Sequence, residues 1–310
     1  PSTVSLPEPS LIPTPTGPVA ITEPSLQQIL AIDKKKGILS RIDVASGIVE
    51  EKSIGISGFQ DIRLIRYEDA VYMVTVRQEK KKTVVTFYNE AWKKIKEWSV
   101  PVTGAQSLLV GNVLGNTTPE IILAPLSGGT VVYRVYSWDG KEVFKQTVKT
   151  AHTGVSLGLY RNGEERDGIL VAYSTKGAFS LYHYTGDHTL VRKISLRDVK
   201  KRASLASGDV NGDGIEEYLV GGGIGEAPYL FIYNADGSVS RQWFGYDPSQ
   251  KGIAIDVGDY DQDGKDDILV SSVLGVTPVR VWNSRGKKVA EWDILEGKGG
   301  RDITILPLVE

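Results

Sequence analysis

The chain has 310 residues, a formal net charge of −2 and 24% charged residues, an ordinary composition for a globular protein. The near-neutral charge gives no reason to expect nucleic-acid binding, and the absence of cysteine excludes disulfides, zinc-thiolate sites and cysteine nucleophiles. No apolar run approaches the roughly 20 residues of a membrane-spanning helix, so we expect no membrane span. The length allows one large β domain or two smaller ones.

Residues 1–24 hold seven of the 14 prolines, mixed with serine and threonine. Such a composition favours extended polyproline II structure and cannot build a core. We therefore predict a linker or stalk over 1–24, with an expression remnant as the alternative, and a folded domain over 25–310. Because the chain starts at Pro1 without a methionine or a signal peptide, we expect a mature or excised fragment. We further expect it to be a monomeric domain of a larger chain.

The rest of the chain repeats with a period of about 48 residues. An aromatic residue ends an apolar stretch just before a polar turn at five regularly spaced positions: Tyr88, Tyr136, Tyr184, Tyr233 and Trp282. A second aromatic column follows that turn at Trp98, Trp243 and Trp292. Each unit is predicted to form four short strands, which is typical of a β-propeller blade. We expect the aromatic columns to pack one blade on the next rather than to form a functional aromatic box.

The two ends of the repeat region complement each other. The first unit lacks its first strand, since residues 27–34 already look like a second strand. The last segment, residues 302–308, is one additional first strand. Placing that strand in the first blade removes two exposed edges, which a sheet protein must otherwise protect. The sequence therefore predicts an all-β, six-bladed β-propeller of four-stranded blades, closed by its C-terminal strand.

Two acidic loops lie 50 residues apart, over residues 209–217 and 259–267. Each places oxygen-bearing side chains at positions 1, 3, 5 and 9 and a glycine at position 6, where the chain must bend sharply. Ca²⁺ takes six to eight oxygen ligands in flexible geometry. We therefore predict two Ca²⁺ sites, with position 7 supplying a backbone carbonyl, built from Asp209, Asn211, Asp213, Ile215 and Glu217, and from Asp259, Asp261, Asp263, Lys265 and Asp267.

An EF-hand does not explain these loops. That motif needs a bidentate glutamate at position 12 between two helices, whereas position 12 here is Val220 or Val270 within an apolar, strand-like stretch. An ordinary Asp/Asn/Gly turn without metal remains the alternative interpretation of each loop.

Residues 203–295 resemble the FG-GAP repeats of integrin α-subunits, also described as VCBS-type repeats in bacterial proteins. The matching features are the two glycine- and aspartate-rich loops, the following apolar strands, and Ala227-Pro228 and Thr277-Pro278 before the next strand. The resemblance implies Ca²⁺ between strands one and two of a blade, on the lower face of the propeller. It also implies partners on the upper face and an extracellular or cell-surface location, but no single activity.

The remaining units depart from this family pattern. The loop at 112–120 has Leu114 in place of a ligand and keeps one carboxylate, and the loop at 160–168 has Arg166, which would repel a cation. The second blade has no acidic loop, so we expect no Ca²⁺ in these units. Six blades instead of the seven of integrins also mean that integrin ligand recognition does not transfer to this chain.

Loops that join strands two and three, and loops that join one blade to the next, share the upper face. Basic residues outnumber acidic ones in these loops, which indicates a cationic surface that attracts an anionic protein or glycan. Lysines that merely solubilise turns are the alternative interpretation. The residues predicted to contact a partner are His152, Lys200, Lys201, Arg202, Lys251 and Arg301.

A binding or adhesion module without catalytic activity is the function that these features favour. Resting cytosolic Ca²⁺ would leave sites of about 10⁻⁴–10⁻³ M affinity empty, which favours an extracellular location. The alternatives are a polysaccharide-acting enzyme, with His152 as a base at the mouth of the propeller, and a structural spacer. Sialidase boxes, a Gly-x-Ser-x-Gly elbow and a His-Glu-x-x-His motif are absent from the sequence.

Overall fold

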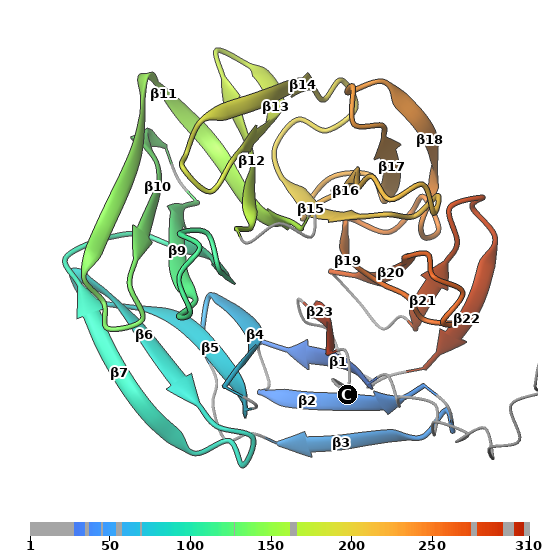
Figure 1. Ribbon diagram of the computed structural model, residues 1–310, viewed down its shortest axis with the longest axis horizontal. Coiled ribbons are helices and arrows are strands. Elements are labelled where there is room, and N and C mark those ends of the chain that lie inside the picture. The colour runs from blue at the N-terminus through green and yellow to red at the C-terminus, as the bar shows by residue number, and fades with distance from the viewer. Residues whose placement is uncertain are drawn as a thin grey trace, which may run out of the picture.

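The computed structural model (Figure 1) describes residues 28–34, 37–44, 46–53, 58–68, 70–126, 128–161, 166–273, 278–293 and 301–306. The predicted linker at 1–24 lies outside these residues. The described residues form 23 β-strands and no helix, so none of them forms a helix that could cross a membrane. The predicted all-β class is confirmed.

The strands form four four-stranded blades and one seven-stranded sheet. The first blade contains β23 (Arg301–Leu306), β1 (Gln28–Asp33), β2 (Ile38–Asp43) and β3 (Val49–Ser53). The second contains β4 (Asp61–Tyr67), β5 (Ala70–Glu79), β6 (Lys82–Tyr88) and β7 (Lys94–Val100). The last two contain β15 (Ala203–Gly208), β16 (Glu217–Gly222), β17 (Tyr229–Tyr233) and β18 (Val239–Phe244), and β19 (Ile253–Gly258), β20 (Asp267–Ser272), β21 (Val279–Trp282) and β22 (Lys288–Trp292).

The seven-stranded sheet joins β8 to β14 in sequence order. Its strands are β8 (Gln106–Gly111), β9 (Glu120–Pro125), β10 (Gly129–Tyr136), β11 (Glu142–Tyr160), β12 (Gly168–Thr175), β13 (Ala178–Tyr184) and β14 (Leu190–Ser195). In Figure 1 the sheets stand around a common centre, with β4, β15, β19 and β23 facing inward. This arrangement is that of a β-propeller.

Six separate four-stranded blades are not observed, and this corrects the sequence-based expectation. Strand β11 runs without interruption for 19 residues. Its first part pairs with β10 and its last part, from His152 to Tyr160, pairs with β12. No proline interrupts this segment, and Gly154 (φ +71°) lets the strand bend without ending. The sequence therefore contained no signal that would separate the two sets of strands.

The C-terminal strand β23 pairs antiparallel with β1, in a register that runs from Gln28 opposite Leu306 to Asp33 opposite Arg301. This is the pairing expected for residues 302–308, apart from the last two residues, which lie outside the described part of the chain. Strand β23 covers an edge of β1 that would otherwise expose its unpaired N–H and C=O groups.

The core lies within and between the sheets. Every residue of β8, β16 and β20 is buried, as expected for strands with packed side chains on both faces. The aromatic columns pack neighbouring sheets together: the rings of Trp98 and Tyr136 lie 5.6 Å apart, and those of Trp243 and Trp282 lie 6.2 Å apart. These contacts assign the columns to packing.

Two truncations test the roles of the chain ends. Ending the chain at residue 300 should lower the melting temperature by about 5 °C or more, because β1 loses its partner along six residues. Removing residues 1–24 should leave the melting temperature unchanged if this segment is a linker. Differential scanning calorimetry of both truncated proteins checks the pair. Equal destabilisation by both truncations would contradict the linker interpretation.

Candidate functional site

The second acidic loop connects β19 to β20 and gathers three carboxylates. One oxygen from each of Asp259, Asp261 and Asp263 lies within 4.8 Å of the others. Asp259 shapes the turn: its Oδ2 accepts a hydrogen bond from the backbone N–H of Gly264 at 3.0 Å, and its Oδ1 accepts one from Asp263 at 3.0 Å. Gly264 has φ +81°, a conformation that favours glycine at position 6.

The first loop, between β15 and β16, has the same turn. Asp209 accepts hydrogen bonds from the backbone N–H groups of Gly212 at 2.7 Å and Gly214 at 2.8 Å. Asn211 differs from its counterpart Asp261, because its Nδ2 donates to Glu217 Oε1 at 2.6 Å. Within the described residues, only the second loop brings three acidic side chains together closely enough to hold an ion.

The acid at position 9 is buried in both loops. Glu217 and Asp267 are 3% and 6% exposed. Burial, reinforced by the neighbouring carboxylates, raises the pKa of each to about 7. Asp267 Oδ2 is buried and has no hydrogen-bond partner, whereas the amide of Asn211 serves Glu217 in the first loop. The second loop thus has an orphaned buried oxygen beside three clustered carboxylates, a donor set that fits a hard divalent cation.

The residues at position 7 lie on the surface. Ile215 is 52% exposed, and Lys265 is also exposed. The aliphatic stem of Lys265 lies where a side chain at Gly212 would be, so this lysine of the second loop packs beside the first loop. Neither side chain can ligate a cation, so a contribution from these positions would have to come from the backbone, as predicted.

In the loop at 112–120, uncharged donors surround the buried acid. Glu120, the counterpart of Glu217, is 2% exposed and accepts hydrogen bonds from the backbone N–H groups of Val113 and Leu114, both at 3.0 Å, and from Asn116 Nδ2 at 2.9 Å. Neutral donors therefore satisfy the buried carboxylate. In the loop at 160–168, residues 162–165 lie outside the described part of the chain.

A row of carboxylates that the sequence analysis did not single out links neighbouring sheets and repeats. Asp167 Oδ2 accepts from Asn112 N at 2.7 Å, Glu216 Oε2 from Arg161 N at 2.9 Å, and Asp266 Oδ2 from Asp209 N at 2.9 Å. The backbone N–H groups of Asp167 and Asp266 bond back to the carbonyls of Asn112 and Asp209, at 2.8 and 3.0 Å. Burial raises the pKa of all three acids, that of Glu216 to about 7.

A sequence signal for this row exists. Each of these acids immediately precedes a second strand (β12, β16 or β20), and they recur at steps of 49 and 50 residues. The loop motif predicts a ligand at position 9, whereas the residue at position 8 is the one that bonds to the preceding repeat. Metal-ligand reasoning alone considers only one loop at a time and therefore missed it.

The prediction that His152 contacts a partner from an exposed loop is wrong. His152 lies within β11, is fully buried, and its Nε2 makes a hydrogen bond with the carbonyl of Val131 at 2.6 Å. A side chain in this position also cannot act as a base at the mouth of the propeller. The error arose because the absence of an interblade turn was not visible in the sequence.

Lys200, Lys201 and Lys251 are exposed as predicted. The β16–β17 loop lies beside them: Glu226 Oε1 accepts from the backbone of Lys200 and Lys201, at 3.2 and 2.6 Å, and Gly225 N donates to the carbonyl of Lys251 at 3.4 Å. Glu226 therefore adds a negative charge beside these lysines. The side chain of the remaining predicted residue, Arg301, lies outside the described residues.

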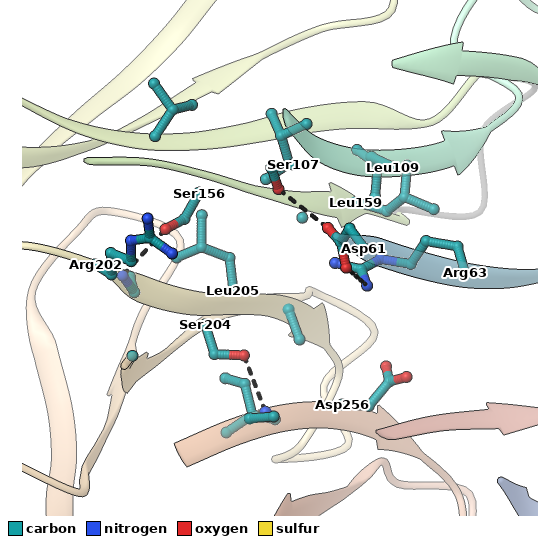
Figure 2. Close-up of a pocket in the computed structure, with 18 of the residues that line it drawn as sticks. Asp61, Arg63, Ser107, Leu109, Ser156, Leu159, Arg202, Ser204, Leu205 and Asp256 are labelled. Carbon is teal, nitrogen blue, oxygen red and sulfur yellow. Dashed lines mark hydrogen bonds and ion pairs between the residues drawn. The ribbon is translucent and has the colours of Figure 1, made fainter. Parts of the chain in front are cut away.

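Arg202 instead lines a central cavity of about 320 Å³ (Figure 2). The innermost strands β4, β8, β11, β15 and β19 surround this cavity. Asp61, on its wall, is 7% exposed and accepts from Lys34 Nζ at 2.9 Å, Arg63 at 3.1 Å and the backbone of Leu108 at 2.8 Å. The cavity wall is therefore partly polar, although many aliphatic side chains also line it, and Asp61 connects residues from three sheets.

Residues 209–270 match the model of the FG-GAP-like repeat, which confirms the resemblance over this segment. No curated protein matches the chain. Among solved structures, the chain is similar to AofleA from Arthrobotrys oligospora, with 10% identity, a TM-score of 0.56 and 92% and 91% of the two chains covered. It is also similar to a functionally unknown protein from Desulfotomaculum acetoxidans DSM 771, with 15% identity, a TM-score of 0.52 and coverage of 89% and 85%. These likenesses concern the fold alone.

A reciprocal swap tests the electrostatic difference between the two loops. Without divalent cations, Asp261→Asn should stabilise the protein by about 1 kcal/mol, because it removes a charge beside Asp267 and adds an amide donor. Asn211→Asp should destabilise it by a similar amount, because Glu217 loses its donor. Chemical denaturation in EDTA measures both effects. Changes of the same sign in the two variants would contradict this account of the loops.

Proposed function

We propose that this chain is a calcium-stabilised β-propeller that acts as a binding module for an anionic protein or glycan outside the cell or at its surface. The cluster of Asp259, Asp261 and Asp263 beside the orphaned oxygen of Asp267 is the observation that carries the calcium assignment. Asp209, Asp213 and Glu217 would hold a second ion, with Asn211 turning its amide oxygen toward the cation.

Ca²⁺ would act here as a structural ion that stabilises the loops. Each loop joins the innermost strand of a blade to the next strand, and Asp209 and Asp266 link the two loops through reciprocal hydrogen bonds. Neutralising the clustered charges would therefore stabilise both loops and the contact between their blades. The weak affinity typical of extracellular calcium modules supports a location where Ca²⁺ is abundant.

We also propose that the propeller is closed and has six structural units. In this interpretation the seven-stranded sheet corresponds to two blades that share β11, whose first part is the outermost strand of one blade and whose last part is the innermost strand of the next. The pairings of β11 with β10 and with β12 support this view, as does the pairing of β23 with β1.

The end of the propeller where Lys200, Lys201 and Lys251 lie would bind the partner. Their backbones are fixed by the adjacent β16–β17 loop, while their side chains are exposed. Lys80 and Lys81, in the β5–β6 turn, are exposed at the equivalent end of their own blade. Lysines that gather at one end create a positive potential, which attracts polyanions over about a Debye length.

Thermal melting in 1 mM Ca²⁺ and in excess EDTA tests the metal sites. We expect Ca²⁺ to raise the free energy of unfolding by up to about 2.7 kcal/mol, the gain from a ligand present at 100 times its Kd. Asp263→Ala should remove most of the response, and Asp213→Ala a smaller part. Mg²⁺ should replace Ca²⁺ poorly, because it demands a stricter octahedral geometry. An identical melting curve in Ca²⁺ and EDTA would reduce both loops to acidic turns.

Charge reversal tests the binding surface. Lys200→Glu combined with Lys201→Glu should weaken binding to polygalacturonate by about tenfold or more at low salt, and added salt should weaken binding by the wild-type protein. Arg285→Glu combined with Lys287→Glu is the matched control, because both residues are exposed in the β21–β22 turn at the opposite end of a blade. Isothermal titration calorimetry compares the affinities. An equal loss of polygalacturonate affinity in both double variants would contradict the assignment of the binding surface.

A further inference from the structure

The central cavity has an excess of hydrogen-bond donors. Ser156 Oγ accepts from the backbone N–H of Ala203 at 3.1 Å, and Ser204 Oγ accepts from Ile255 N at 2.9 Å. Both serines line the cavity, and Ser156 is 8% exposed. Since a hydroxyl also carries one hydrogen, each serine has a donor for which no acceptor is present among the described residues. A ligand rich in acceptor oxygens complements these groups.

Arg202 adds a positive charge to the same wall. It precedes β15, lines the cavity and is half-buried, and its guanidinium has no ion-pair or hydrogen-bond partner among the described residues (Figure 2). A guanidinium presents a planar fork of donors that matches a carboxylate in two parallel hydrogen bonds. Arg202 follows the exposed Lys200 and Lys201 directly in the sequence, so the chain leads from the proposed binding surface to the cavity wall.

The acids of the cavity wall do not favour a cationic ligand. Asp61 already accepts from Lys34, Arg63 and two backbone N–H groups, those of Ile62 and Leu108. With Arg161 and Arg202 included, four cationic side chains line the cavity against two carboxylates, those of Asp61 and Asp256. The net charge of the lining is therefore positive.

Asp256 gives the ligand a second requirement. It lies on β19, the strand beside β15, which carries Ser204 (Figure 2), and its Oδ1 accepts a hydrogen bond from the backbone N–H of Val257 at 2.9 Å. A carboxylate offers about four lone-pair directions, so it can accept from a hydroxyl group of a ligand. The volume of about 320 Å³ is at the lower end of the about 300–1,000 Å³ typical of ligand pockets, which favours one small unit over an oligomer.

We propose that the central cavity binds a compact polyhydroxy carboxylate, the chemistry of a single uronic acid unit. Its carboxylate pairs with Arg202, its ring oxygens accept from Ser156 and Ser204, and a hydroxyl donates to Asp256. The proposal rests on the proposed binding function, because it names the unit of an anionic glycan that the module takes. The exposed lysines then attract the remainder of the glycan.

Calorimetry of the full chain in Ca²⁺ with galacturonate, and with galactose as the neutral counterpart, tests this site. We expect saturable binding of galacturonate and at least about tenfold weaker binding of galactose. Arg202→Gln should weaken galacturonate binding by about tenfold or more, Arg202→Lys should retain part of it, and Ser204→Ala should weaken it by a smaller factor. Arg241→Gln, at an exposed position on β18, is the matched control and should bind normally.

Melting curves establish that each variant is folded, and Arg202→Lys keeps the test informative if Arg202→Gln unfolds. Equal affinity for galactose and galacturonate, wild-type affinity in Arg202→Gln, or no saturable binding to the intact protein would each overturn the proposal. A galacturonate hexamer distinguishes a cavity that binds the free sugar acid from one that binds the end of a polymer chain. If the cavity takes a chain end, the hexamer binds more tightly than the monomer, and Lys200→Glu with Lys201→Glu removes only this gain.

The same measurements separate this site from the proposed function. Loss of polygalacturonate binding on charge reversal of the lysines, with no galacturonate binding in the cavity, would overturn the cavity site and leave the binding surface intact. Arg202-dependent binding of galacturonate without any binding of the polymer would support the cavity site and contradict the polyanion surface.

Discussion

The fold depends on hydrogen bonds that one innermost strand or its loop supplies to the next. Strands β4, β8, β15 and β19 are edges of their sheets, so the N–H groups on their open side need acceptors that their own ladders do not provide. Asp61 serves Leu108, Ser156 serves Ala203, and Ser204 serves Ile255. At the other end of the strands, Asp167, Glu216 and Asp266 do the same for the preceding loop. Side chains thus replace the ladder where sheets meet.

This constraint places two acids side by side in each acidic loop. The acid at position 8 turns to the neighbouring sheet, and the acid at position 9 turns back into its own loop. Burial disfavours the charged form of both, so each loop needs donors or a cation. Asn116 and Asn211 supply amide donors to Glu120 and Glu217. Asp261 cannot donate to Asp267, and Asp267 Oδ2 is left without a hydrogen-bond partner, which is why we propose the second loop as the stronger cation site.

The same side chains of the inner strands set which hydrogen-bond donors and acceptors line the cavity. Asp61 makes several structural contacts, whereas Ser156 and Ser204 use only their lone pairs for the neighbouring strand and each keep a hydrogen, which the proposed ligand would accept. In the proposed site, these residues would therefore serve both the fold and ligand recognition. A substitution that breaks the link between sheets would therefore also change the proposed ligand pocket.

Local patterns in the sequence determined much of this protein. The spacing of Tyr88, Tyr136 and their counterparts predicts the strands and their packing, and Gly264 at position 6 predicts the turn of the acidic loop, because these features depend on residues close in sequence. Tertiary structure alone decided the rest. His152 is buried because β11 continues where a turn was expected, Glu226 approaches Lys200 from another loop, and Asp266 reaches Asp209 across 57 residues. These contacts join segments whose separation is set by how sheets stack around a centre, and no local pattern encodes that distance.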